Sequence, residues 1–402
     1  MADLSARAAL TLFALAFTAA PVCAQALKPD QVLSSLELRP LSPPNPVLGA
    51  DNRIHLAYEL VAVNATKLFV TLDKVEAVDA QGKVLAAMNG AELAAMMTVH
   101  GGNRATLSPG GSAFIFLDVT VATGAPMPKQ LSARVTLTRQ LADVNGKPAA
   151  FPTTEPVPAT ISFVGAATKV GASVVVIAPP LRGGRWVAVN GCCSEVTSHR
   201  GAVMAVNGAF RVPERFAIDW VQLDASDRLF TGDLSKLTSY PYFGTAVHAV
   251  ADGTVVNLYD GSPEQVPGQP AKGITPANIG GNMLVIDIGG GHYAFYAHLQ
   301  PGSLRVKLGE KVKTGDVIAL LGNTGNSTAP HLHFHVMDGT SPLDANGLPY
   351  VFTRFTGDGV VQESTEEDMF AKGTPATIDR AALAGPHRNQ LPLNNQVVDF
   401  GN

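Results

Sequence analysis

Residues 326–336 read Asn-Ser-Thr-Ala-Pro-His-Leu-His-Phe-His-Val and predict a strand with a chemically active face. After the proline, apolar residues alternate with His331, His333 and His335, which is the period-two pattern of a half-buried strand. Three imidazoles therefore share one face. Buried imidazoles need partners and repel one another when charged, so a divalent metal bound by neutral nitrogens is the most economical use of such a face. Zinc is the first candidate, and a polar face that is merely rich in histidine is the alternative.

The composition favours an all-β fold with more than one domain. A chain of 402 residues is long enough for two or three domains that each bury a core. Hydrophobic residues make up 46% and charged residues only 15%, while the 39 glycines and 28 prolines favour short strands and many turns. A formal charge of −4 gives no electrostatic footprint for nucleic acid or for an anionic membrane, so we predict neither as a partner.

The first residues predict export. Arg7, the apolar run 8–20 and the small residues that end at Ala24 are typical of a cleavable signal peptide over residues 1–24. The run is too short for a membrane span, and no later segment reaches the roughly 18 consecutive apolar residues that a spanning helix needs. We therefore expect a soluble protein that is periplasmic or secreted. Lipidation at Cys23 is the alternative, but the residues before this cysteine make a poor lipobox.

The remaining cysteines, Cys192 and Cys193, are adjacent in the sequence. Adjacent cysteines either form a strained vicinal disulfide in an oxidising compartment or stay as thiols. We do not assign them to a metal, because no second Cys or His pair stands nearby at zinc-finger spacing.

The part of the chain before about residue 165 predicts an antiparallel β-sandwich. Short alternating runs are separated there by turn clusters rich in Asp, Asn, Gly and Pro. The clearest runs are 55–63, 68–72, 113–121 and 131–137. Their spacing suits an immunoglobulin-like domain over residues 25–165, although the Cys…Trp…Cys pattern is missing, so only the architecture is predicted. His55 and His100 are isolated and are interpreted as structural or surface residues.

A second β-rich domain is predicted over residues 180–350, with strand runs separated by glycine-rich turns. Within it, segment 306–321 alternates charged and hydrophobic residues about two glycines and predicts a tight hairpin. Residues 351–402 are predicted to be a C-terminal extension. Its largely polar tail after Phe370 is expected to wrap the surface or to be partly disordered.

Several motifs of the second domain occur in an order that identifies a family. They are Gly244-Thr-Ala-Val-His-Ala-Val-Ala-Asp-Gly253, Asn282–Asp287, Tyr296-Ala-His-Leu299, Lys311–Ile318 and Gly322–Phe334. This order resembles the lysostaphin-type (LytM-domain) zinc endopeptidases, which cut peptidoglycan peptides. The resemblance covers about 180 residues, and it is specific because several motifs agree where any one would be weak. It implies a small antiparallel β-sheet domain with an open groove.

Carried over residue by residue, the family's last motif places a catalytic histidine at His331 and a zinc-binding histidine at His333. The family's Tyr-x-His motif falls on Tyr296 and His298, whose ring would sit beside the zinc site. If this segment is extended, alternate residues from His292 to His298 share one face, which would point His298 into the groove. A hydrolytic zinc site needs three protein ligands, an open fourth position and nearby imidazoles, and the resemblance implies each of these.

The family's other ligand motif, His-x-Gly-x-Asp, is only partly matched. Asp219 fits its carboxylate, but Arg215 occupies the place of its histidine, and a guanidinium has no lone pair for zinc. We therefore predict that His199, the nearest upstream histidine, is the third ligand and reaches the metal from a loop. The alternatives are a structural ion pair for Arg215 and a surface position for His199. His335 replaces a glutamate of the family and is either an outer-sphere residue or an alternative ligand, whereas His248 is interpreted as structural.

Three classes of function follow from these patterns. The leading one is an exported zinc metalloendopeptidase that hydrolyses peptide bonds in peptidoglycan crosslinks, with peptide stems as substrates and cell-wall enzymes as possible partners. Its sandwich would position the enzyme or restrict the groove. The second is a degenerate, non-catalytic member that binds the wall or regulates amidases, which Arg215 keeps open. The third, a lipoyl- or biotin-like carrier, is suggested only by segment 306–321, which lacks a lysine in a Met-Lys-Met context.

Overall fold

The computed structural model describes residues 31–151, 158–165 and 167–402. The expected signal peptide and Cys23 lie outside these residues. Residues 34–402 form one compact unit. Among the described residues, no helix has the length and apolar character needed to cross a membrane.

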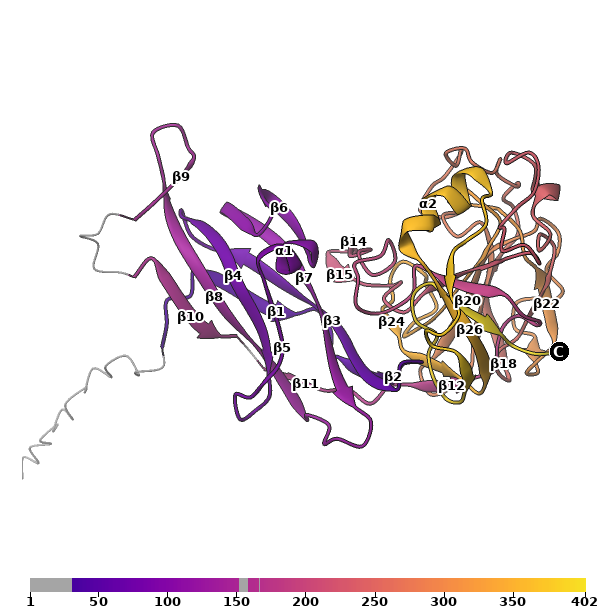
Figure 1. Ribbon diagram of the computed structural model, residues 1–402, viewed down its shortest axis with the longest axis horizontal. Coiled ribbons are helices and arrows are strands. Elements are labelled where there is room, and N and C mark those ends of the chain that lie inside the picture. Colours follow the sequence, from indigo (N-terminus) through magenta and orange to yellow (C-terminus); the bar gives the residue numbers. More distant parts are fainter. Residues whose placement is uncertain (1–30, 152–157, 166) are drawn as a thin grey trace, which may run out of the picture. The chain divides into compact units, whose positions relative to one another are not determined.

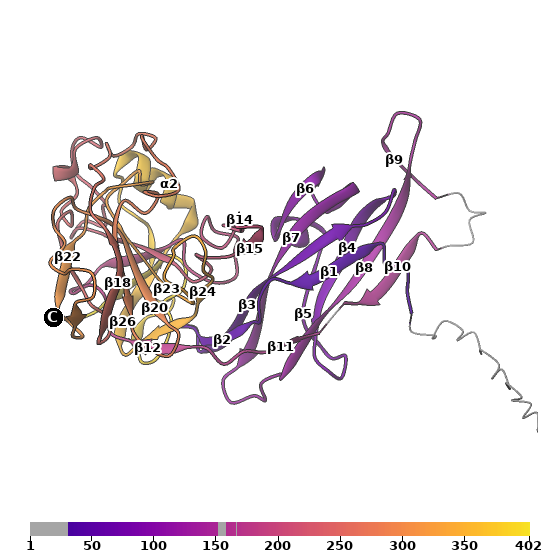
Figure 2. The ribbon, with the colours of Figure 1, turned by 180° about the vertical axis from the view of Figure 1, so that it is seen from behind.

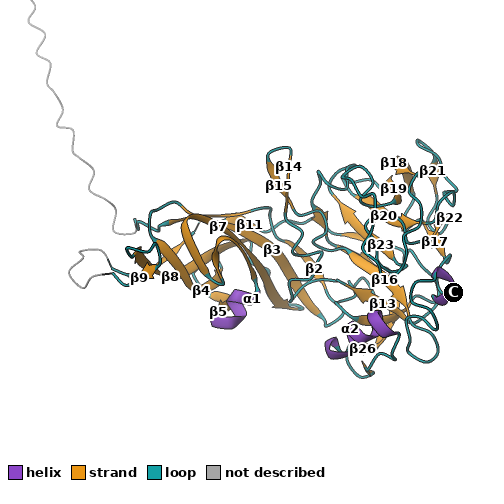
Figure 3. Ribbon diagram, turned by 90° about the horizontal axis from the view of Figure 1, so that it is seen from above, coloured by secondary structure: helices purple, strands orange, loops and turns teal. Residues whose placement is uncertain are grey.

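Strands dominate the described chain, which confirms the predicted all-β fold class (Figure 3). Its helical elements are α1 (Gly90–Ala95), α2 (Glu363–Lys372) and a 3₁₀ turn at Leu237–Ser239. Helix α2 ends at Gly373, whose left-handed φ of 62° is the conformation that stops helices and that glycine adopts without strain.

The N-terminal part of the compact unit is an antiparallel sheet of eleven strands, coloured indigo to magenta in Figure 1. The strands are β1 (Leu36–Pro40), β2 (Asn45–Leu48), β3 (Arg53–Asn64), β4 (Phe69–Val78), β5 (Val84–Asn89), β6 (Met97–Asn103), β7 (Thr106–Ala122), β8 (Gln130–Ala142), β9 (Pro148–Ala149), β10 (Thr160–Val164) and β11 (Thr168–Lys169). Two longer sets, β1-β3-β7 and β4-β8-β10, are joined only through two residue pairs between β4 and β7. Both sets contribute to a single hydrophobic core, as a sandwich requires. We call this part the N-terminal sheet.

The second part is built on a twelve-stranded sheet, seen from behind in Figure 2. Its central order is β21-β18-β19-β20-β23-β16-β13-β29-β26-β27. The strands are β13 (Trp186–Val189), β16 (Ile218–Gln222), β18 (Gly253–Tyr259), β19 (Asn282–Asp287), β20 (Tyr293–Leu299), β21 (Lys311–Val312), β23 (Leu332–Met337), β24 (Gly347–Leu348), β26 (Phe355–Val361), β27 (Ile378–Asp379), β28 (Gly385–His387) and β29 (Gln396–Asp399). Small two-stranded pairings accompany it: β12 (Val175–Ile177) with β25 (Tyr350–Phe352), β14 (Met204–Val206) with β15 (Ala209–Arg211), and β17 (Ala246–His248) with β22 (Val317–Leu320).

The C-terminal tail is part of this sheet, so the expectation of a surface-wrapping or partly disordered tail is wrong. Strand β29 lies between β13 and β26 and pairs with both. Its Val397 and Val398 are buried in the core. The polar composition of the tail concealed this strand, because only four residues carry it and their partners lie far away in the sequence.

The expected hairpin at 306–321 is also wrong. Strand β21 pairs with β18, and β22 pairs with β17, so neither strand pairs with the other. The chain does turn at Gly315, where φ is +89°, and the turn is closed by a bond from Asp316 N to Lys313 O of 3.0 Å. The alternating pattern therefore marked a turn between two short strands, but the partners of those strands are set by tertiary structure.

Candidate metal centre

Three neighbouring strands, β20, β23 and β16, carry the centre of the site. The register places Asp219 of β16 opposite His333 of β23, and His333 opposite Ala297 of β20. Residues that alternate with these, such as Trp220 and Phe334, are fully buried in the hydrophobic core. Because strand side chains alternate between faces, Asp219 and His333 must share the opposite face of the sheet.

The structure brings His199 to this pair. Asp219 Oδ1 lies 2.9 Å from His333 Nδ1, and Asp219 Oδ2 lies 3.2 Å from His199 Nε2. One ligand atom from each of the three residues lies within 4.8 Å of the other two. His199 comes from the loop between β13 and β14 and is 6% exposed, so it is not a surface residue. An imidazole–imidazole–carboxylate set of this size suits a divalent metal of zinc type.

The two predicted catalytic histidines border the same centre. His331 Nε2 lies 3.3 Å from Asp219 Oδ1, and the rings of His331 and His298 have centroids 4.5 Å apart. The His298 and His333 centroids are 5.8 Å apart. All residues of the predicted site therefore gather in one place.

Backbone carbonyls fix the tautomer of three of these rings. His199 Nδ1 lies 3.1 Å from the Ala217 carbonyl, His331 Nδ1 lies 2.8 Å from that of Ala329, and His298 Nδ1 lies 2.7 Å from that of Thr324. A carbonyl only accepts hydrogen bonds, so each neutral ring carries its proton on Nδ1 and keeps a lone pair on Nε2. This is the arrangement that orients a metal-ligating or proton-accepting histidine.

Charge and burial set the protonation of the centre. Burial alone would raise the pKa of Asp219, but the neighbouring His199 and His331 hold it well below its usual range. Burial opposes charge on His199, yet the Asp219 carboxylate raises the pKa of that imidazole to about 9. Burial lowers the pKa of His298 and of His335 well below the ordinary value, and neighbouring imidazoles lower both further. The rings of His298 and His335 are therefore neutral at physiological pH.

His298 reaches the site by a different route from the one predicted. Simple alternation would put His298 on the face of Tyr296, but Tyr296 is fully buried in the core, where its hydroxyl accepts a bond of 2.9 Å from Val250 N. His298 instead has a left-handed φ of 60°, next to a shift in the β19–β20 register. Its backbone N–H donates to Gly280 O over 2.9 Å. This irregularity, which alternation cannot predict, turns the ring to the other face.

A cavity of about 460 Å³ lies over these side chains. The metal-centre residues line it together with His335 and Glu214. The remaining lining is largely apolar and includes Met204, Ile279, Phe295 and Leu343. A cavity that combines such polar groups with apolar walls is typical of a substrate site.

Arg215 does not face the centre. Its guanidinium forms a buried ion pair with Glu59 of the N-terminal sheet, with Nη2 at 2.5 Å from Oε2, and it also donates to the Gly347 carbonyl over 3.1 Å. Arg215 is therefore the structural ion pair that the sequence left as an alternative. His248 Nδ1 lies 2.9 Å from the Gly315 carbonyl, outside the centre.

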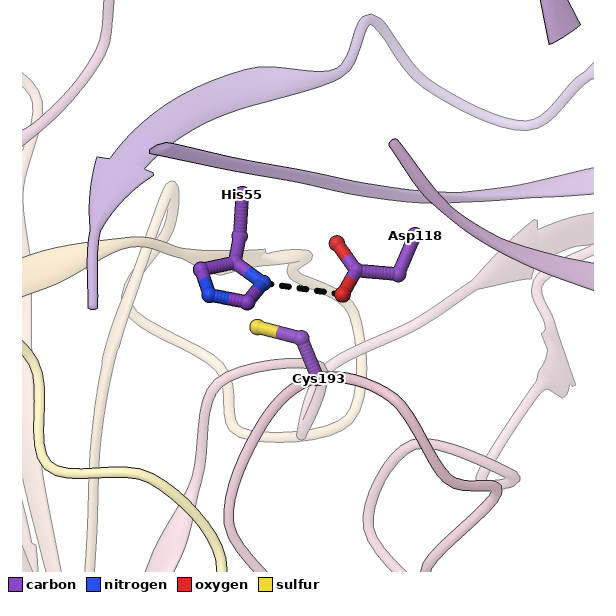
Figure 4. Close-up of side chains that lie close together, drawn as sticks. All are labelled: His55, Asp118 and Cys193. Atoms are coloured by element: carbon purple, nitrogen blue, oxygen red, sulfur yellow. Dashed lines mark hydrogen bonds and ion pairs between the residues drawn. The ribbon is translucent and has the colours of Figure 1, made fainter. Parts of the chain in front are cut away.

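A second group of possible ligand atoms consists of His55, Asp118 and Cys193 (Figure 4). His55 Nδ1 lies 2.8 Å from Asp118 Oδ2, and its Nε2 lies 3.2 Å from Asp51 Oδ1. Cys193 forms a disulfide with Cys192, so its sulfur is not available as a thiolate ligand. His55 thus serves as a hydrogen-bonded structural residue.

Sequence reasoning missed Asn190. Its amide donates to Asp219 Oδ2 over 2.9 Å and so helps to hold the carboxylate in place. The only sequence signal is an Asn-Gly turn directly after β13, which says nothing about where the side chain points.

Residues 238–345 match peptidase family M23. This part of the chain is a peptidase family M23 domain. The matched range includes His298, His331 and His333, and it begins after His199 and Asp219. The glycyl-glycine endopeptidase ALE-1 of Staphylococcus capitis is 33% identical over 116 residues, which are 29% of this chain and 28% of that relative. The peptidoglycan DD-endopeptidase ShyB of Vibrio cholerae is 46% identical over 65 residues, which are 16% of this chain and 15% of that relative.

Among solved structures, the catalytic domain of the antimicrobial peptidase lysostaphin from Staphylococcus simulans is 26% identical. The match covers 36% of this chain and 80% of that domain, with a TM-score of 0.21. The chain spans 28% of the length of the first of the two curated relatives and 15% of the second.

Proposed function

We propose that the protein is an exported zinc metalloendopeptidase that hydrolyses peptide bonds in peptidoglycan crosslinks. The observation that carries this proposal is the meeting of His199, Asp219 and His333, whose candidate ligand atoms all lie within 4.8 Å of one another. The names of the M23 relatives, a glycyl-glycine endopeptidase and a peptidoglycan DD-endopeptidase, support the substrate class. The predicted signal peptide supports export.

The donor set fits a hydrolytic zinc site. His199 would bind through Nε2, Asp219 through its carboxylate and His333 through Nδ1, which leaves a fourth position open toward the cavity. A zinc ion held in this way supplies Lewis-acid activation of a water molecule and of the scissile carbonyl.

The remaining histidines supply proton transfer. His331 and His298 each have Nδ1–H held by a backbone carbonyl, so each offers an Nε2 lone pair as a proton acceptor beside the centre. After accepting a proton, the same nitrogen can donate to the oxygen that develops negative charge or to the leaving amine. The apolar wall around Phe295 and Leu343 would hold an extended peptide and exclude bulk water from the reacting bond.

The non-catalytic alternative rests on Arg215, which stands where the family has a histidine. A regulator would purify without stoichiometric zinc and would release nothing from the wall. The test is therefore to measure zinc content and to digest purified peptidoglycan, with His333→Ala as the inactive control. Mass spectrometry that finds new peptide amino termini supports the endopeptidase. An absence of both zinc and new termini contradicts it and favours the regulator.

A further inference from the structure

The loop that carries His199 is tied to the N-terminal sheet. It spans residues 190–203, between β13 and β14, and the residue after His199 is Arg200, which is 0% exposed. Arg200 Nη2 donates to the Leu117 carbonyl of β7 over 2.6 Å. We propose that Arg200 is a positioning residue that holds the third metal ligand, so that the N-terminal sheet completes the metal centre. This inference rests on the proposed function.

The turn that links the two side chains is tight. Gly201 N donates to Thr197 O over 2.9 Å, Ala202 N donates to His199 O over 3.1 Å, and Arg200 N donates to Thr197 Oγ1 over 3.3 Å. With the backbone fixed on both sides, a displacement of Arg200 must move His199. The 3.2 Å approach of His199 Nε2 to Asp219 therefore depends on where Arg200 is anchored.

The anchor itself is costly, which argues against a purely incidental contact. The Nε and Nη1 atoms of Arg200 are buried without a hydrogen-bond partner. A buried guanidinium of this kind is destabilising unless charges nearby compensate it. The carboxylates of Glu59 and Asp118, both on the N-terminal sheet, provide that compensation. Burial of an apolar residue at this position would cost less free energy. We therefore attribute the arginine to its bond with the Leu117 carbonyl, which holds the loop of His199.

The first part of the loop is fixed by separate contacts. Cys193 is 3% exposed and lies beside His55 and Asp118 of the N-terminal sheet (Figure 4). The Cys192 carbonyl accepts a bond of 3.1 Å from Asn394 N. The vicinal disulfide and Arg200 thus secure the loop on either side of residues 194–199, and the ligand is presented between the two anchors.

The test is a double-mutant cycle on the full chain, with Zn²⁺ affinity as the readout from chelator competition. We expect Arg200→Met to weaken Zn²⁺ binding by about 10–100-fold, as for loss of an outer-sphere partner of a metal ligand. In a His199→Ala background, the same substitution should change the affinity by less than about twofold, because coupled residues are not additive. Arg139→Met is the matched control, since Arg139 is 4% exposed and donates to a carbonyl within the N-terminal sheet, at Pro158. It should leave Zn²⁺ affinity unchanged.

A spectrum of the bound metal tests the proposal even if the Arg200 variant is less stable than the wild type. The d–d spectrum of the Co²⁺-loaded Arg200→Met protein should shift from that of the wild type toward that of Co²⁺-loaded His199→Ala, because His199 is displaced from its position at the metal. Should Arg200→Met fail to fold, Arg200→Lys, which keeps the charge but not the planar fork, should show the same shift at least in part. Two results would contradict the positioning role of Arg200 without affecting the proposed function. One is a folded Arg200 variant with the Zn²⁺ affinity and Co²⁺ spectrum of the wild type. The other is an equal loss of Zn²⁺ affinity when Arg200→Met is made in the His199→Ala background. Unchanged Zn²⁺ affinity in His199→Ala would instead contradict the proposed ligand set.

Discussion

His333 Nε2 lies 3.0 Å from His335 Nδ1, so the two histidines on one face of β23 contact each other directly. The Asp219 carboxylate only accepts, so without a metal a neutral His333 donates to it from Nδ1 and accepts at Nε2. A metal at Nδ1 would require the ring proton on Nε2, which would donate to the lone pair on His335 Nδ1. His335 then fixes the tautomer that leaves His333 Nδ1 free for a metal. This finding favours the outer-sphere role for His335 over the role of alternative ligand.

Removal of that acceptor should weaken the metal site. We expect His335→Leu to lower Zn²⁺ affinity by about 10–100-fold, the usual effect of losing a partner of a ligating histidine. His335→Asn should restore much of the loss, because its Oδ1 can accept where Nδ1 did. Titration calorimetry of both variants measures the difference. Equal affinities for the Leu and Asn variants would show that the acceptor at this position does not matter.

Alanine substitutions of His333, His331 and His298 should affect zinc content and activity differently, because these residues have different roles. His333→Ala is expected to lose metal and activity together, because it removes a ligand. His331→Ala and His298→Ala should retain zinc while losing about 10²–10⁴-fold in turnover, the usual contribution of a positioned acid–base group. Zinc analysis and wall digestion on the same samples test this. Metal loss in His331→Ala would show that the roles of His331 and His333 are reversed.

His199 should behave as a ligand and not as a nearby polar residue. We expect His199→Ala to reduce Zn²⁺ affinity about as strongly as His333→Ala, by several kcal/mol, since either leaves the metal with two protein ligands. His248→Ala is a suitable control, because His248 bonds only a carbonyl outside the centre. If the two alanine variants differ by orders of magnitude in affinity, the third ligand must be sought elsewhere.

Glu264 should make stability depend on pH. Burial raises the pKa of its carboxyl from 4.5 to about 7, although Asn323 N donates to it over 2.6 Å. Since the folded protein binds this proton more tightly than the unfolded chain, the contribution to stability is present below pH 4.5 and is lost as the pH rises through about 7. Glu264→Gln stays neutral, so its melting temperature relative to wild type should rise between about pH 5 and pH 8. A constant difference across this range would contradict the raised pKa.

Substitution of Arg215 or Glu59 alone should lower the free energy of unfolding more than substitution of both residues together. Either Arg215→Met or Glu59→Leu leaves one buried charge alone, which typically costs about 3–5 kcal/mol. The double variant should recover part of that loss in denaturant unfolding, because Asp118 then remains as the carboxylate that compensates Arg200. Arg380→Met is the control, because Arg380 is half exposed in its ion pair with Asp227 and such pairs contribute about 0–1 kcal/mol. Additive losses in the double variant would mean that the pair's charges do not depend on each other.

Local pattern was sufficient for the centre of the site. The alternation of residues 331–336 placed His333 and His335 on one face, and it did so because Leu332 and Phe334 must fill the core on the other. The resemblance to the family motif indicated Asp219, whose carboxylate lies 2.9 Å from His333 Nδ1, and the chemistry of a guanidinium excluded Arg215 as a ligand. The all-β class followed from composition and turn chemistry.

What could not be predicted depends on contacts between distant parts of the chain. The turn of His298 into the cavity requires a left-handed residue and a partner at Gly280, and neither leaves a mark on the period-two pattern. The sequence predicted that His199 reaches the site from a loop, but not that its neighbour Arg200 donates to the Leu117 carbonyl, about 80 residues earlier in the chain. The pairing of β29 depends on β13, some 200 residues earlier. Such contacts are set by the tertiary fold and are not encoded in neighbouring residues.

The place of β29 in the sheet has a consequence for biosynthesis. Strand β13 follows β16 and β23 in the sheet order, and its outer edge is closed only by β29. During translation that edge stays open until Asp399 has been made, although every metal-centre residue has been synthesised by then. An open edge invites pairing with other chains, and the sheet that supports His333 and Asp219 lacks part of its core until Val397 and Val398 arrive. A chain that stops before Gln396 therefore leaves this edge of the sheet unpaired, although it already contains every residue of the candidate metal centre.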